Sequence, residues 1–134
     1  MKKYISVALL LLVLLALTGC SGKPYEFKKS VDEIKTIEIV WAEDSLDYTV
    51  RKTLSESEKE EFLEQFLELE FDRYLFGDPS SVHGDAVKIT YKNGDYEIIC
   101  HHWAEYVKNG KAGFLWKNCE DDEDFNNLLK KFSD

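Results

Sequence analysis

The chain has 134 residues, of which 26 are acidic and 17 are basic, so its formal net charge is −9. This length fits a single domain with one hydrophobic core. The acidic balance argues against a protein that binds nucleic acid, because phosphate contacts need clustered lysine and arginine. We therefore expect no nucleic-acid partner.

The first twenty residues have the pattern of a secretion signal. Lys2 and Lys3 precede an apolar run from Ile5 to Leu17 that only Ser6 interrupts. As a helix this run would span about 20 Å, which is too short for a hydrocarbon core of about 30 Å. The pattern favours a cleaved signal peptide over a membrane-spanning anchor.

The signal ends in Leu17-Thr18-Gly19-Cys20. These four residues resemble the bacterial lipobox, the L-[AST]-[GA]-C pattern of lipoprotein signal peptides. The resemblance covers residues 1–20 and implies diacylglyceryl transfer to the Cys20 thiol and cleavage after Gly19. It also implies a membrane partner reached through the lipid, and a location on the extracytoplasmic face of the cell membrane. The alternative is an ordinary secretory signal with a chance cysteine.

The lipobox divides the chain into a signal peptide (1–19), a lipidated cysteine with its tether (20–30) and one domain (31–134). Loss of Lys2 and Lys3 changes the net charge from −9 to −11. The small residues of Ser21-Gly22-Lys23-Pro24 predict a short, flexible tether that lifts the domain off the bilayer. The mature domain resembles the small lipoproteins of Gram-positive bacteria in size and layout, a resemblance that implies no activity.

The expected secondary structure follows from hydrophobic periodicity and capping signals. Alternating, β-branched stretches predict two strands, and a capping box at Ser55-Glu56-Ser57-Glu58 predicts the start of a helix. A short strand and a loop follow, and a 3-1-3 apolar spacing predicts a C-terminal helix. The expected elements are strands at 36–41 and 46–51, a helix at 56–68, a short strand within 70–76, a loop at 77–81, and a helix through Phe125, Leu128, Leu129 and Phe132.

Two Asn-Gly pairs, at 93–94 and 109–110, predict two hairpins in series with two-residue turns. The strands would cover 86–92, 95–108 and 111–119. In this register Ile89 faces Ile98, Trp103 faces Trp116, and Cys100 faces Cys119. The sequence therefore predicts an α+β domain of order β-β-α-(β)-β-β-β-α, an antiparallel sheet with a central double hairpin and two helices packed on one face.

Cys100 and Cys119 carry the first site hypothesis. The export signal and the predicted register favour a disulfide between them, because such bonds persist outside the cytoplasm. Free buried thiols are an alternative. A metal site formed by Cys100, His102 and Cys119 is a further alternative, although no characteristic ligand spacing supports it.

The predicted sheet also carries an aromatic cluster of Trp103, Trp116, Phe114 and His101. If exposed, it would be a flat binding platform for a sugar ring or for an apolar side chain of a partner. Alternatively, the two indoles form a second small core under another part of the chain.

The sequence contains no recognisable catalytic motif and predicts no cofactor apart from the lipid on Cys20. The leading hypothesis is a non-enzymatic, membrane-anchored domain that binds an unknown protein or an envelope polymer. It would use the aromatic platform or the acidic surface. A metal-binding envelope protein and a hydrolase of envelope polymers are the alternatives, and the hydrolase requires a pocket with two carboxylates or a carboxylate and a histidine.

Overall fold

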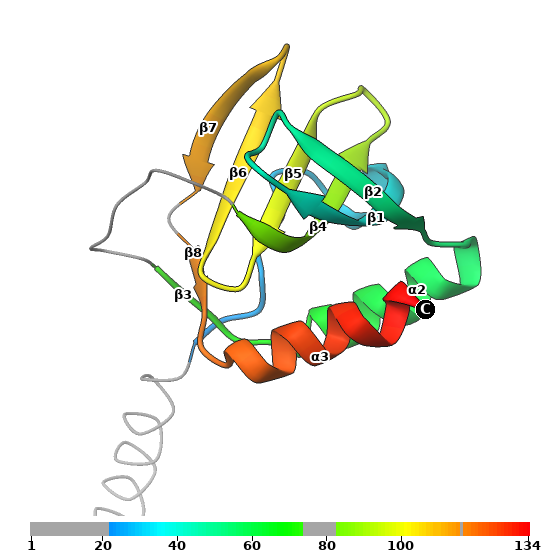
Figure 1. Cartoon of the computed structure of the whole chain (residues 1–134), viewed down its shortest axis with the longest axis vertical. Helices are drawn as coiled ribbons and strands as arrows, with labels where there is room; N and C mark the ends of the chain where they lie inside the picture. The colour runs from blue at the N-terminus through cyan, green and yellow to red at the C-terminus, as the bar shows by residue number, and fades with distance from the viewer. Residues whose placement is uncertain (1–21, 74–82, 116) are drawn as a thin grey trace, which may run out of the picture.

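The computed structural model describes residues 22–73, 83–115 and 117–134. Two helices lie along one face of a six-stranded antiparallel sheet of order β2-β1-β4-β5-β6-β7, and β3 pairs with β8 beside it (Figure 1). The predicted α+β class is confirmed. The elements are η1 (Val31–Glu33), β1 (Ile34–Ala42), β2 (Tyr48–Thr53), α2 (Glu56–Phe66), β3 (Phe71–Arg73), β4 (Gly84–Tyr91), β5 (Tyr96–Cys100), β6 (Trp103–Lys108), β7 (Lys111–Leu115), β8 (Lys117–Cys119) and α3 (Asp122–Ser133).

Both helices begin at the caps that their sequences provide. The Ser55 side chain accepts a hydrogen bond from the Glu58 amide, and the Glu58 carboxylate accepts one from the Ser55 amide, so the predicted capping box is present. The Asp121 carboxylate accepts from the Asp124 amide at 2.9 Å and caps α3. The predicted loop at 77–81 lies outside the described residues.

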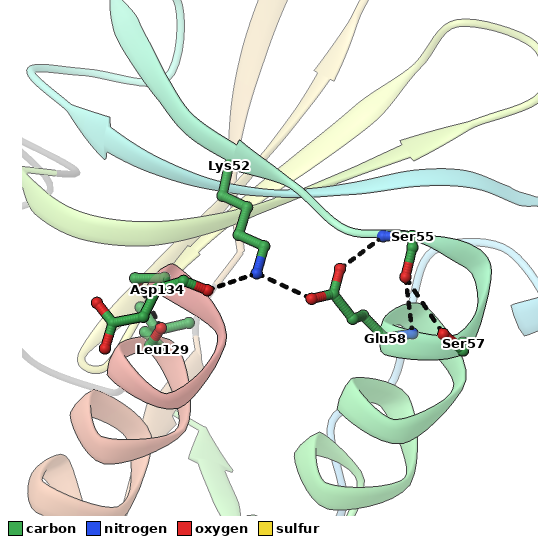
Figure 2. Close-up of polar contacts among 7 residues, drawn as sticks. Lys52, Ser55, Ser57, Glu58, Leu129 and Asp134 are labelled. Atoms are coloured by element: carbon green, nitrogen blue, oxygen red, sulfur yellow. Dashed lines mark hydrogen bonds and ion pairs between the residues drawn. The ribbon is translucent and has the colours of Figure 1, made fainter.

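Lys52, at the end of β2, joins the sheet to both helices (Figure 2). Its Nζ lies 2.8 Å from the Glu58 carboxylate and donates to the Asp134 carbonyl oxygen at 2.7 Å. The bonds from Lys52 and from the Ser55 amide lower the pKa of Glu58 to about 2. One cation thus connects the first turn of α2 to the last residue of the chain.

The sheet buries apolar side chains on both faces. The helix-side core contains residues from β1, β4 and both helices. Aromatic contacts join these elements: Phe62 of α2 packs on Phe132 of α3, and Phe66 of α2 packs on Phe71 of β3. The opposite face carries a smaller group that we call the outer cluster. Its fully buried members are Val40, Ala42, Ala86, Ile98, Cys100 and Trp103, with Tyr48, Tyr96 and Phe114 packed against them.

The first predicted hairpin is out of register by one residue. Its turn takes three residues, Lys92-Asn93-Gly94, because Tyr91 pairs with Asp95 through a hydrogen bond from the Tyr91 amide to the Asp95 carbonyl. Gly94 adopts a φ of 93°, which only glycine tolerates easily. Ile89 therefore faces Glu97, not Ile98. Because side chains alternate along a strand, this shift turns Glu97 and Ile99 inward and Ile98 outward.

The predicted strand 95–108 is also wrong, because it is two strands. The chain reverses at His101-His102, and Cys100 pairs with Trp103. The second hairpin is confirmed: Val107 faces Ala112, and Asn109 and Gly110 have φ values of 51° and 73°, as a two-residue primed turn requires. The two turns together place β5 between β4 and β6.

The N-terminal segment belongs to the domain, so the prediction of a flexible tether through residue 24 is wrong. The Lys23 amide donates to the Phe71 carbonyl at 3.1 Å, and the Phe71 amide donates back at 2.7 Å. Tyr25 is 3% exposed, and its ring packs on Phe66 and Phe71. The folded domain therefore includes residues 23–30, which the prediction assigned to the tether.

Glu97 is a fully buried carboxylate that holds this segment to the sheet. It accepts hydrogen bonds from the Tyr25 hydroxyl at 2.7 Å, from the Lys28 amide at 3.1 Å, and from the Tyr91 hydroxyl. Burial and the neighbouring Glu97 charge raise the pKa values of Tyr25 and Tyr91, so both hydroxyls stay protonated and donate. We call this group the Glu97 network.

Replacing Tyr25 by Phe should destabilise the domain by about 1–3 kcal/mol, because it removes one hydrogen bond to a buried charge while keeping the ring. Urea unfolding of the soluble chain from Ser21 to Asp134 measures this. Tyr106→Phe is the control, since Tyr106 donates to the carboxylate of Asp95 at a more open site and its loss should cost less. An equal or smaller loss for Tyr25→Phe would contradict the network's role.

Candidate functional site

The structure does not support the aromatic platform. Trp103 is 2% exposed, and its ring centre lies 4.2 Å from that of Phe114 inside the outer cluster. His101 lies in the turn between β5 and β6, not on the strand of Trp103. Trp116 lies outside the described residues. A buried indole cannot stack on a ligand, so the prediction of Trp103 as an exposed ligand-binding residue is wrong.

The two cysteines occupy different parts of the fold. Cys100 pairs with Trp103 in the outer cluster, whereas Cys119 pairs with Phe71 in the helix-side core. Both are free thiols, and burial raises the pKa of Cys100 to about 12 and that of Cys119 to about 11. The predicted facing of Cys100 and Cys119, on which the disulfide hypothesis rested, is wrong because the chain turns at His101-His102.

The alternative metal site of Cys100, His102 and Cys119 is not assembled either. His102 is exposed, and its Nδ1 lies 2.8 Å from Nε2 of His101, which in turn is 3.8 Å from the Asp122 carboxylate. Burial and the adjacent His101 lower the pKa of His102. Across the ranges that the structure describes, no group of three His, Cys, Asp or Glu side chains could hold a metal ion.

Carboxylates gather instead in a groove where the end of α2, β3, β8 and the start of α3 meet. A hollow of about 420 Å³ there has Leu69 and Cys119 among its lining residues. It adjoins a second hollow of about 400 Å³ between the two helices, and both share Glu68, Leu69 and Asp124. We call the first hollow the acidic groove, and its carboxylates are Glu68, Glu70, Glu120, Asp121 and Asp124.

Strand pairing explains why these acids meet although they come from two separate stretches of sequence. Phe71 of β3 pairs with Cys119 of β8, so the residues just before β3 and just after β8 lie side by side. The Glu120 amide donates to the Glu70 carbonyl at 3.0 Å and fixes this arrangement. The sequence alone did not bring Glu68 and Glu70 to Glu120 and Asp121, because the pairing of two three-residue strands leaves no periodic signal.

Within the described residues, no basic side chain pairs with the acids of the groove. Elsewhere acids pair with cations, as Glu38 does with Lys88 and Glu61 with Lys131. Among the residues described here, none of the five groove carboxylates forms an ion pair with a lysine, arginine or histidine side chain. The groove therefore concentrates negative charge on a chain that is already acidic.

Glu120 lies beside two further carboxyl groups, those of Asp72 and Glu70. Hydrogen bonds with the Asp72 and Glu70 carboxyl groups, together with their charges, raise the pKa of Glu120 to about 7. A hydrogen bond between carboxyl groups requires a proton, which Glu120 holds below neutral pH. These carboxyl groups therefore lose their shared proton close to pH 7.

No family model, curated protein or solved structure that was compared matches this chain. Within the described residues, no helix is long and apolar enough to cross a membrane. The geometry of the chain's own residues therefore carries the functional argument.

The raised pKa of Glu120 predicts a pH dependence of stability. Glu120 binds its proton more tightly in the folded than in the unfolded chain, so its contribution to the free energy of unfolding falls as the pH rises from about 4.5 to about 7. Glu120→Gln should remove that fall. Melting temperatures at pH 4.5, 5.5 and 7, compared between the two proteins, measure the difference.

Glu60→Gln is the matched control, because Glu60 is an exposed acid on α2 outside the groove. Its melting temperature should keep the wild-type dependence on pH. If Glu120→Gln also keeps that dependence, Glu120 does not share a proton with its neighbours.

Proposed function

We propose that this protein is a lipoprotein anchored through Cys20 on the extracytoplasmic face of the cell membrane, where it binds a cationic partner in the acidic groove. The partner we favour is a lysine- or arginine-bearing peptide segment of an envelope protein. The lipobox at residues 17–20 supports the anchor, and the net charge of −9 supports a cationic partner.

The observation that carries the proposal is the gathering of five carboxylates in the groove, none of which forms an ion pair with a basic side chain among the described residues. Holding like charges together is unfavourable, and the raised pKa of Glu120 reports that cost. A cationic side chain in the groove would replace the shared proton and offset the repulsion. The hollow of about 420 Å³ accepts one or two long basic side chains with their stems along Leu69.

The groove supports hydrolysis of an envelope polymer less well. A carboxyl group with a pKa of about 7 beside other carboxylates does resemble a general acid with its partner. However, glycoside hydrolases separate their two carboxyl groups by about 5 Å or more, so that substrate or water fits between them. Asp72 and Glu70 lie close enough to Glu120 to raise its pKa to about 7, and carboxyl groups this close suit cation binding better.

The anchor predicts a covalent modification at Cys20. In a bacterium that processes lipoproteins, the mature N-terminal peptide should begin at Cys20 and carry the mass of a diacylglyceryl group. Mass spectrometry of the membrane fraction measures this. Cys20→Ala should yield no lipid-bearing peptide, and a wild-type peptide with an unmodified Cys20 would contradict the anchor.

The groove predicts binding of a short oligolysine peptide that weakens with salt and strengthens between pH 6 and pH 8, as Glu120 loses its proton. Titration calorimetry of the soluble chain measures the affinity. Glu120→Gln should weaken binding about two- to fivefold, the range for one exposed ion pair.

Glu60→Gln makes the same change of charge outside the groove and should leave the affinity within error of wild type. If both variants weaken binding equally, the peptide senses the net charge of the protein and not the groove. That result would contradict the proposal.

A further inference from the structure

The described structure begins close to the residue that would carry the lipid. Gly22 is two residues after Cys20, and Lys23 is already bonded to Phe71 by two backbone hydrogen bonds. Two residues reach at most about 7 Å when fully extended. If Cys20 carries the lipid, the bilayer surface therefore lies close to Gly22, because the connecting chain is too short to place it elsewhere.

Gly22 lies against the wall of the acidic groove. A Cβ atom on Gly22 would come within 2.7 Å of the Glu120 carboxylate oxygen and 3.0 Å of the Glu70 Cβ. A side chain at position 22 would have to push the Glu120 carboxylate aside, so the backbone at Gly22 passes directly beside Glu120. The point where the chain leaves the domain and the groove are thus the same place on the surface.

Contacts with the core also fix the orientation of the N-terminal segment relative to the rest of the domain. Tyr25, three residues beyond Gly22, is buried and bonded to Glu97, and its ring contacts Phe66 and Phe71. Because the segment is held at Lys23, Tyr25 and Lys28, residues 23–28 cannot act as a flexible joint, and only two residues separate them from Cys20. The anchor therefore restrains both the height and the orientation of the domain.

We propose that the lipid-anchored domain rests on the bilayer with its groove end, defined by Gly22, Lys23, Glu70 and Glu120, turned toward the lipid headgroups. This inference rests on the lipid anchor of the proposed function. In Figure 1 the turn between β6 and β7 lies at the opposite end of the molecule from the start of the described chain. That turn, at Asn109-Gly110, then points away from the membrane.

In this orientation the groove meets its partner at the membrane surface. Cations collect at an anionic bilayer surface within about a Debye length, roughly 8 Å at physiological salt. A groove in this layer meets basic segments that lie along the membrane. The repulsion between its carboxylates and anionic headgroups is screened over the same distance, and two acyl chains hold the protein in place against it.

Fluorescence quenching by headgroup-labelled lipids tests the orientation. A single cysteine at Glu123 in the first turn of α3 probes the groove end, and one at Lys111 beside the β6–β7 turn probes the far end, since both positions are exposed. The native Cys100 and Cys119 are buried with raised pKa values and should stay unlabelled. The lipidated protein is inserted into phosphatidylcholine vesicles that contain nitroxide headgroups.

The dye at Glu123→Cys should be quenched at least threefold more strongly than the dye at Lys111→Cys. A variant with eight Gly-Ser residues inserted between Ser21 and Gly22 keeps the lipid but frees the domain, so the two positions should approach equal quenching. Equal quenching without the insertion, or stronger quenching at Lys111→Cys, overturns the orientation.

The intact mass of each protein is recorded first. It shows whether Cys20 carries the lipid, and so tests the anchor separately from the orientation. A lipid-bearing protein with equal quenching overturns the orientation and leaves the anchor standing. A protein whose Cys20 carries no lipid overturns the anchor and the orientation together.

Discussion

A single buried carboxylate constrains the whole N-terminal part of this fold. Glu97 is completely inaccessible to solvent and faces the helix-side core. A buried charge is costly unless it is fully hydrogen-bonded, and two of its three donors come from Tyr25 and Lys28 of the N-terminal segment. The sheet therefore cannot close around Glu97 unless this segment is in place, which makes residues 22–28 an integral part of the domain.

The position of this segment explains the position of the groove. Tyr25 packs on Phe71, and Lys23 bonds to Phe71, so the N-terminal segment supports β3. β3 pairs with β8 and brings the acids before and after these two strands together. At the other end of the helices, Lys52 connects the first turn of α2 to the last residue of the chain (Figure 2).

The sequence predicted correctly some features that are determined by a few adjacent residues. The capping box at Ser55 and the Asn109-Gly110 turn are confirmed because each depends on a few adjacent residues. The Asn93-Gly94 turn and the reversal at His101-His102 were not predictable in this way, because tertiary pairing selected a three-residue turn and a turn without Gly or Pro. The inward position of Glu97 follows from the three-residue turn, and the groove follows from the β3–β8 pairing; neither leaves a local signal in the sequence.

Amide hydrogen exchange on the soluble chain tests most directly whether the Glu97 network holds the N-terminal segment. The Lys23 amide donates to Phe71 and the Lys28 amide donates to Glu97. Both amides should exchange nearly as slowly as the amide of Ile89 in β4, and Tyr25→Phe should accelerate both. If both amides exchange as fast as the amide of Gly110 in its exposed turn while the amides of β4 stay protected, the Glu97 network does not hold the segment.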